Sequence, residues 1–139
     1  YINYTINSRN QDDIAPFCAH VHALPRVRAT FFYFHTPYYG RDSLHVDLGG
    51  RRRILEQIIE LRKTYRILNS RAGLLCAMRN DWARPMGACS VYEKGVLYTC
   101  CRTSDDPELC RQCGYLSYAE IDQALKLKPS ALLNALNYF

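Results

Sequence analysis

Residues 27–34 read Val27-Arg28-Ala29-Thr30-Phe31-Phe32-Tyr33-Phe34, a nearly unbroken apolar run, and this stretch decides the fold. A strand with one solvated face alternates apolar and polar side chains, whereas a strand in a parallel sheet flanked by helices is covered on both faces. The run therefore predicts a buried strand in an α/β fold.

On both sides of this strand, the spacing of apolar residues is typical of further strands and helices. Residues 1–6 alternate as a strand does, and residues 12–24 carry apolar side chains at helical spacing. Residues 51–65 have the clearest amphipathic helical pattern, and a short strand over 66–69 and a helix over 72–78 follow. The order β, α, β, α, β, α predicts parallel strands joined by right-handed crossovers.

The character of the sequence changes at Pro85. Cysteines, turn residues and short strand-forming segments replace the periodic helices until a helix begins at Ser117. Ser117 and Glu120 have the spacing of a capping box, and one more short amphipathic helix covers 129–139. The chain therefore divides into residues 1–85, 86–116 and 117–139.

The composition limits the class of protein. An apolar fraction of 48% suffices for a globular core, and no stretch approaches the roughly 18 uninterrupted apolar residues of a membrane span. The start, Tyr1-Ile2-Asn3-Tyr4, lacks the basic and then apolar layout of a signal peptide. We therefore expect a cytoplasmic protein without a membrane partner. Because a strand begins at the first residue, we also expect the chain to be a piece of a longer protein.

The charge pattern gives no support for nucleic acid as a partner. The net charge is +5, and much of the excess lies in Arg51, Arg52 and Arg53 and in scattered lysines. A nucleic-acid-binding face gathers its basic residues along one stripe. The arginine triplet could contact phosphate, but we expect it to be the solvated start of a helix.

The cysteines are unevenly distributed. Five of the seven lie within residues 89–113, whereas Cys18 and Cys76 stand alone in apolar patterns, where Cys18 is expected to be buried. In a chain without a secretory signal, this clustering favours metal over disulfides. Cys110 and Cys113 have the spacing at which one tight turn supplies two thiolates to one metal.

A hairpin supplies the other two thiolates. Glu93-Lys94-Gly95 is a turn flanked by strand formers, so Cys89 and Cys100 are expected to face each other across the hairpin. The neighbouring Cys101 points to the other side and is the alternative to Cys100. Four thiolates close a zinc site or fill an iron–sulfur cubane, and the spacing does not decide between the two. Reduced, buried thiols are the alternative without metal. The predicted ligands are Cys89, Cys100, Cys110 and Cys113.

This arrangement resembles the auxiliary-cluster region of radical S-adenosylmethionine (radical SAM) enzymes in its shorter, single-cluster form, the twitch domain, of which the SPASM domain is the longer form. The resemblance rests on Cys89, on Gly95 separated by four residues from Cys100, and on Cys110-x-x-Cys113. Upstream, Tyr4-Thr5-Ile6-Asn7-Ser8-Arg9-Asn10 followed by Asp13-Ile14 looks like the fifth strand and helix of that family's barrel. Phe32-Tyr33-Phe34-His35-Thr36-Pro37 looks like its sixth strand.

The resemblance implies a fold and two cofactors. Residues 1–85 would be the later βα units of a partial TIM-like barrel, 86–116 a small Cys-rich cluster-binding region, and 117–139 the C-terminal helices. The region would bind an auxiliary 4Fe-4S cluster that anchors substrate or relays electrons. S-adenosylmethionine would be bound and cleaved in the full-length protein. The family's Cys-x-x-x-Cys-x-x-Cys triplet is absent from this sequence, so we expect the chain to be inactive alone.

Barrel enzymes place their chemistry at the carboxyl ends of the strands. The candidates for contact with substrate or cofactor are therefore Asn7, His35, Tyr38, Arg41 and Asn69. His35 could instead cap a strand end, and Arg41 could form a local ion pair with Asp42. Packing is the more typical role for Tyr38.

The expected partners are the missing N-terminal half of the barrel, an unknown substrate, and a second copy that pairs with an exposed strand edge. The alternative function is a zinc-stabilised four-cysteine domain that binds protein or nucleic acid, and a third is a purely structural zinc domain. The parallel βα units argue against a compact zinc finger, which would not need them to fold.

Overall fold

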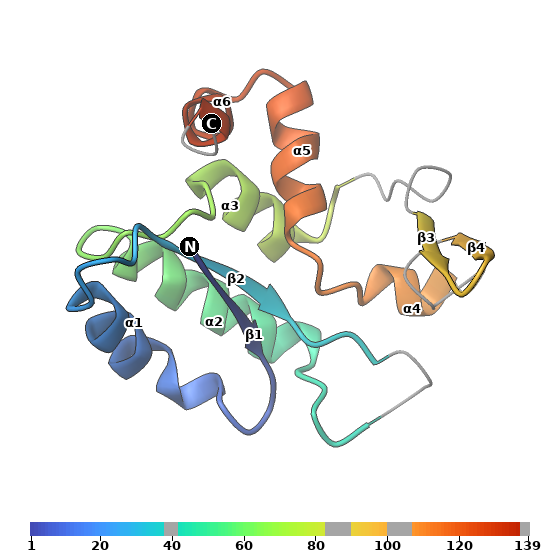
Figure 1. Ribbon diagram of the computed structural model, residues 1–139, viewed down its shortest axis with the longest axis horizontal. Helices are drawn as coiled ribbons and strands as arrows, with labels where there is room; N and C mark the ends of the chain where they lie inside the picture. Colours follow the sequence, from blue (N-terminus) through green and yellow to red (C-terminus); the bar gives the residue numbers. More distant parts are fainter. Residues whose placement is uncertain (38–41, 83–89, 100–106, 137–139) are drawn as a thin grey trace.

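The computed structural model describes residues 1–37, 42–82, 90–99 and 107–136. Strands β1 (Ile2–Ile6) and β2 (Thr30–Phe34) pair in parallel, with Ile2 opposite Thr30 and Ile6 opposite Phe34. A 3₁₀ turn (Gln11–Asp13) and helix α1 (Ile14–His22) join them. The predicted parallel pair and its crossover helix are confirmed (Figure 1).

The predicted third strand, residues 66–69, is reduced to one parallel bridge between Thr30 and Ile67. Thr30 N donates to Arg66 O at 3.0 Å, and Leu68 N donates to Thr30 O at 2.8 Å. At the next position it is the side chain of Asn69, and not its backbone, that forms hydrogen bonds with the backbone of Phe32 in β2. The strand therefore ends because a side-chain amide takes the place of the next backbone group.

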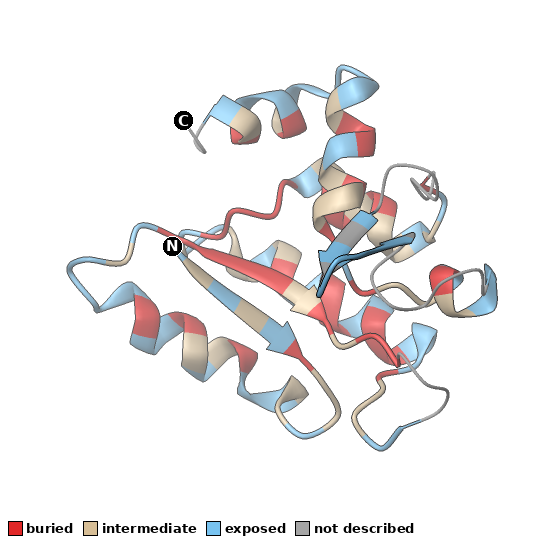
Figure 2. Cartoon of the chain, turned by 45° about the vertical axis from the view of Figure 1, so that its right-hand side comes forward, coloured by how far each residue is buried: buried red, intermediate tan, exposed pale blue. Residues whose placement is uncertain are grey.

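One face of the sheet is covered by α1 and α2 (Leu48–Leu61). The rings of Tyr4 and Phe32 contact Phe17 of α1, and Phe34 lies beneath Arg51 of α2. Because Tyr4, Phe32 and Phe34 share a face, both helices lie on the same side of the strands. Figure 2 shows β2 buried along almost its whole length, as the apolar run predicts.

Helix α2 begins earlier than the sequence pattern indicates. Asp47 is its N-cap, and the Asp47 side chain accepts a hydrogen bond from Gly50 N at 2.6 Å. An aspartate cap also meets the positive end of the helix dipole. The predicted start at Arg51 therefore missed almost one turn.

The remaining helices pack beside β2. Helix α3 (Arg71–Arg79) has Ser70 as its N-cap and packs against α5 (Ser117–Leu125), which in turn contacts α6 (Pro129–Leu136). The capping box at the start of α5 is wrong, because that end of the helix has no side-chain cap. Glu120 accepts a hydrogen bond from Ser70 N at 2.7 Å instead, so its carboxylate lies at the N-terminus of α3.

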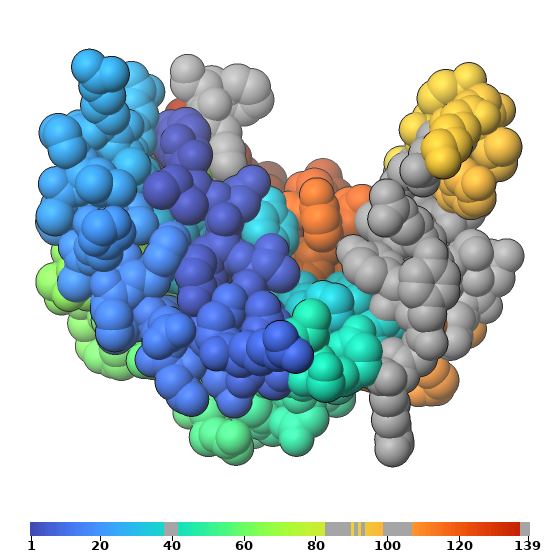
Figure 3. All heavy atoms as spheres, turned by 60° about the horizontal axis from the view of Figure 1, so that its bottom comes forward, coloured from blue at the N-terminus to red at the C-terminus, as the bar shows by residue number. Residues whose placement is uncertain are grey.

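The hairpin is present as predicted. Strands β3 (Ser90–Glu93) and β4 (Val96–Thr99) are antiparallel, with Ser90 opposite Thr99. Gly95 has φ +84°, which the turn requires and which glycine adopts without strain. Figure 3 shows the hairpin standing out at one end of the molecule, and α4 (Pro107–Arg111) follows it in the chain.

The fold is thus mixed α/β, with a two-stranded parallel sheet among the described residues. The strand order β1, β2, Ile67 follows the chain, and successive crossover helices lie on one side. Such an arrangement is compatible with consecutive units of a barrel. The partial barrel itself stays a prediction.

Candidate functional site

The carboxyl ends of the strands carry the predicted site residues, but the structure gives them different roles. Asn7 forms a turn, in which its side-chain oxygen accepts from Arg9 N at 2.9 Å. Asn69 has no exposed surface, and its amide is bonded to the backbone of Phe32. It therefore cannot contact a substrate in this structure. Tyr38 and Arg41 lie outside the described residues.

His35 lies at the carboxyl end of β2 and pairs with Asp42. His35 Nε2 and Asp42 Oδ2 are 2.8 Å apart, with 22% and 40% of the two side chains exposed. This hydrogen bond is the main cause of a lowered pKa at Asp42. The suggested ion pair of Asp42 with Arg41 stays untested, because Arg41 lies outside the described residues. The pair offers an accessible imidazole and carboxylate beside a strand end.

His45 lies close to the same loop and was not singled out by the sequence. Its Nδ1 is buried and has no hydrogen-bond partner within the described part of the chain. Burial lowers the pKa of His45, and the charge of Arg51 adds to the effect. The charged groups that affect its pKa, Arg51, Asp42, Asp47 and His35, all lie within ten residues of it in the sequence.

Two of the predicted metal ligands are described, and they share one turn. Cys113 N donates to Cys110 O at 3.1 Å, directly after helix α4. Cys110 is buried, with 6% of its surface exposed, and Cys113 is half-buried. The turn thus has the compact form expected of a Cys-x-x-Cys half-site.

This turn is attached to the carboxyl end of β2. Phe34 N donates to Gly114 O at 2.9 Å, and Gly114 N donates to Thr36 Oγ1 at 2.8 Å. A Cβ atom on Gly114 would lie 1.9 Å from Phe34 O, so only glycine fits at this contact. The residue after Cys113 is therefore fixed next to the strand end that carries His35.

Arg51 of α2 also connects the cysteine turn to the carboxyl end of β2. Its Nη1 donates to Gln112 O at 2.7 Å and to Cys113 O at 3.4 Å, and its Nη2 donates to His35 O at 3.0 Å. Only 6% of Arg51 is exposed. The predicted solvated helix start is wrong for Arg51, although Arg52 and Arg53 are exposed as expected.

A cavity of about 310 Å³ adjoins Cys113. Its walls come from β2, α2, α3 and the segments that follow α3 and α4, and include Phe34, Leu48, Arg52, Met78, Trp82 and Leu116. The cavity is thus a mixed apolar and basic space beside one predicted ligand.

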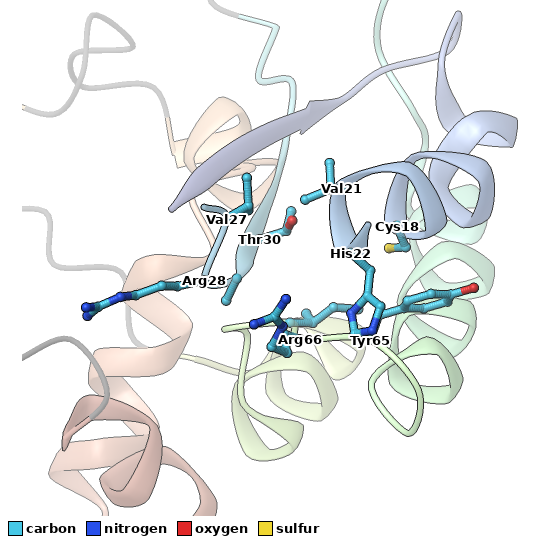
Figure 4. Close-up of a pocket in the computed structure, with 10 residues that line it drawn as sticks. Cys18, Val21, His22, Val27, Arg28, Thr30, Tyr65 and Arg66 are labelled. Atoms are coloured by element: carbon cyan, nitrogen blue, oxygen red, sulfur yellow. The ribbon is translucent and has the colours of Figure 1, made fainter. Parts of the chain in front are cut away.

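The two isolated cysteines are buried, as expected for Cys18. Burial raises the pKa of Cys18 to about 11 and that of Cys76 to about 12. Figure 4 shows Cys18 beside Val21, His22 and Tyr65, around a cavity of only about 10 Å³ at the amino end of β2. Such a space has no room for a ligand, which supports a packing role for Cys18.

The described residues contain no group of three His, Cys, Asp or Glu side chains that could hold a metal ion. The predicted ligands Cys89 and Cys100, and the alternative Cys101, lie outside the ranges described. The four-cysteine metal site therefore stays a prediction, and of its ligands only Cys110 and Cys113 lie within the described residues.

Comparison with known proteins adds no assignment: no protein-family model, curated protein or solved structure matches the chain. None of the helices in the described ranges has the length and apolar character needed to cross a bilayer.

Proposed function

We propose that this chain forms the later βα units and the auxiliary-cluster region of a radical SAM enzyme. The observation that carries the proposal is the attachment of the Cys110–Cys113 turn to the carboxyl end of β2, beside His35. In barrel enzymes this end of the strands surrounds the active site. A metal held by the turn would therefore lie close to the substrate.

The donor set supports four-thiolate binding. Cys110 and Cys113 come from one turn, and the hairpin pairs Ser90 with Thr99, which are the chain neighbours of Cys89 and Cys100. Cys89 and Cys100 themselves lie outside the described residues. Thiolates are the ligands that iron–sulfur clusters and zinc both prefer.

An iron–sulfur cluster, when bound, supplies single-electron transfer or an iron site for substrate. The chain's own residues would do the rest. His35 and Asp42 form a hydrogen-bonded pair at the strand end, and the cavity beside Cys113 offers apolar and guanidinium contacts. S-adenosylmethionine cleavage belongs to the part of the full-length protein that carries the missing cysteine triplet. The proposed cytoplasmic location suits such a cluster.

The proposal also requires a partner for β1. Within the described residues, the edge of β1 opposite β2 pairs with no other strand. A strand edge that presents unpaired backbone groups favours strand addition. The earlier strands of the same barrel are the partner we propose, and a second copy of this chain is the alternative.

A zinc-stabilised binding module with four cysteine ligands is the second candidate function. It is favoured by the hairpin, whose Tyr92 and Leu97 side chains are 73% and 69% exposed. Large exposed apolar side chains on a projecting hairpin are typical of a surface that binds another protein. A structural zinc site alone would leave these side chains unexplained.

Metal analysis after anaerobic iron–sulfur reconstitution tests the two candidates. We expect a brown protein with about four iron and four sulfide per chain, and loss of both in Cys110→Ala and Cys113→Ala. Cys18→Ala is the matched control and should keep the metal. A colourless protein with about one zinc per chain would favour the binding module instead. A chain that takes up neither metal would contradict both candidates.

A further inference from the structure

We propose that this chain binds a dianionic phosphate group in a second cavity, at the amino end of β2, lined by Arg28, Arg62 and Arg66. The group belongs to free phosphate or to a small phosphorylated molecule. This cavity lies at the end of β2 opposite His35 and the cysteine turn, so the proposal does not depend on the proposed metal site.

The fold brings the three arginines to one place. The start of β2 lies beside Arg66, because Thr30 N donates to Arg66 O at 3.0 Å. Arg28 lies two residues before Thr30, and Arg62 is the C-cap of α2, four residues before Arg66. Figure 4 shows Arg28 and Arg66 at this end of the strand. The guanidinium groups therefore border one space from three positions in the chain.

The cavity is large enough for a small molecule. Its volume is about 470 Å³, within the range of ligand pockets. Ala29, Ile67 and Leu68 line it and are buried, and Asn134 of α6 lies on another side, where its Nδ2 donates to Leu68 O. No aspartate or glutamate is among the described residues that line the cavity. Charges of one sign beside apolar walls concentrate the electric field on an anion.

Neighbouring carboxylates leave these positive charges without ion pairs. Within the described parts of the chain, Arg28, Arg62 and Arg66 form no salt bridge, and the buried Nε of Arg62 has no hydrogen-bond partner. Burial lowers the pKa of Arg62, while the charge of Glu120 opposes this effect and that of Arg71 adds to it. Arginine nevertheless stays protonated in proteins. A bound anion would therefore reduce the repulsion among these groups.

The chemistry of arginine favours phosphate over other anions. A guanidinium presents its donors in a planar fork that matches two phosphate oxygens. A phosphate monoester carries a charge of about −1.5 to −2 near pH 7 and three acceptor oxygens, whereas a carboxylate or a phosphodiester carries a single negative charge. Three guanidinium groups therefore favour the dianion. Nucleic acid fits less well, because these arginines surround a cavity and do not form a stripe.

Isothermal titration calorimetry tests the proposal with three probes: inorganic phosphate, glycerol 3-phosphate and dimethyl phosphate. Chloride at about 0.15 M screens general attraction between charges. The variants are Arg28→Gln and Arg66→Gln, both at exposed positions, and Arg62→Lys, which keeps the charge but loses the planar fork. Arg53→Gln is the matched control, since it removes the same charge from an exposed position of α2 that does not line the cavity. Circular dichroism reports whether each variant folds.

We expect inorganic phosphate and glycerol 3-phosphate to bind the wild type, and Arg28→Gln and Arg66→Gln to weaken both at least about tenfold. Arg62→Lys should also bind more weakly, whereas Arg53→Gln should match the wild type. Backbone amide shifts in NMR spectra should change most at residues 66–68 when phosphate is added. Tighter binding of glycerol 3-phosphate would identify a phosphorylated molecule as the source of the group, and tighter binding of inorganic phosphate would identify the free ion.

Equal affinities in Arg66→Gln and Arg53→Gln would overturn the proposal, because they would show general attraction only. Dimethyl phosphate that binds as tightly as glycerol 3-phosphate would also overturn it, and would point to the phosphodiester backbone of nucleic acid. A folded wild-type chain that binds neither phosphate probe would contradict this proposal and leave the proposed function intact. If Arg62→Lys does not fold, the two glutamine variants decide. Phosphate binding by a chain that takes up no metal would support this site and contradict the proposed function.

Discussion

The side-chain amide of Asn69 bonds to both backbone groups of Phe32. Phe32 N donates to Asn69 Oδ1 at 2.7 Å, and Asn69 Nδ2 donates to Phe32 O at 3.1 Å. A carboxamide has the same donor and acceptor as a peptide group, so Asn69 continues the ladder that Arg66 and Leu68 begin. It closes the edge of β2 where no third strand is present among the described residues.

Removing this amide should destabilise the fold. Asn69→Ala leaves Phe32 N and Phe32 O buried without partners, and each unsatisfied group costs about 1–3 kcal/mol. We expect the free energy of unfolding to fall by about 2–4 kcal/mol in urea titrations followed by circular dichroism. Asn3→Ala, at an exposed position of β1, is the control and should change it by less than about 0.5 kcal/mol. Equal free energies of unfolding for the two variants would contradict the structural role of Asn69.

Gly114 should tolerate no side chain. Because an added Cβ would lie 1.9 Å from the backbone oxygen of Phe34, Gly114→Ala should separate the cysteine turn from β2. We expect lower stability of the metal-free chain and weaker metal retention. Gly49→Ala is the control, since its nearest atom would be at an ordinary 3.5 Å, and alanine is the better helix former there. A stable Gly114→Ala variant with normal metal content would contradict this attachment.

Stability should depend on pH through Glu120. Burial raises the pKa of Glu120 from 4.5 to about 7, although the hydrogen bonds from Ser70 and the charge of Arg62 oppose the effect. Between these two values the folded chain holds a proton that the unfolded chain has released. The free energy of unfolding should therefore fall as the pH rises from about 4.5 to 7, by no more than about 3.4 kcal/mol at 1.36 kcal/mol per pKa unit.

Glu120→Gln should flatten that part of the pH profile, whereas Glu56→Gln, at an exposed position of α2, should leave it unchanged. Urea titrations at a series of pH values measure the difference between each variant and the wild type. Parallel profiles for Glu120→Gln and the wild type would show that Glu120 does not titrate in this range.

The hydrogen bond between His35 and Asp42 predicts that the pKa of Asp42 depends on His35. The hydrogen bond from His35 holds the pKa of Asp42 below its ordinary value, so His35→Gln should raise that pKa. A carboxyl group with a lowered pKa in the folded state stabilises the fold at pH values above its pKa in the unfolded state. This contribution is lost as the pH falls through the pKa of the folded state. Carbon-detected NMR titration of Asp42 measures the change, and Asp12, exposed and distant in the chain, serves as the reference carboxyl. An unmoved Asp42 titration would show that the pair is not formed in solution.

The spacing of apolar residues predicted the helices and strands whose buried face can be read from neighbouring residues in the sequence. The apolar run over 27–34 contains β2, and the helical spacing of residues 12–24 and 51–65 marks α1 and most of α2. The turn at Gly95 predicted the hairpin, because a positive φ at that position suits glycine. These signals lie within a few residues of the structure they produce.

The errors came from contacts between distant segments. Residues 66–69 have the composition of a strand, but a side-chain amide 37 residues from Phe32 ends the pairing. Glu120 has the spacing of a capping box for its own helix but lies at the N-terminus of α3 instead. Arg51 follows a solvated pattern within α2, yet its acceptors lie at positions 112 and 113. No periodic pattern indicates such partners.

The hydrogen bond between Gly114 and the edge of β2 also has a consequence for folding during synthesis. The outer edge of β2 is completed in three steps along the chain, by residues 66–68, by Asn69 and finally by Gly114. During synthesis, Phe34 N has to wait for about 80 further residues, roughly 4–16 s at 5–20 residues per second. The nascent sheet stays open at that end for this interval, and contacts of such high sequence separation make folding slow. The hydrogen bond to Gly114 is therefore the last of these three edge contacts that can form during synthesis.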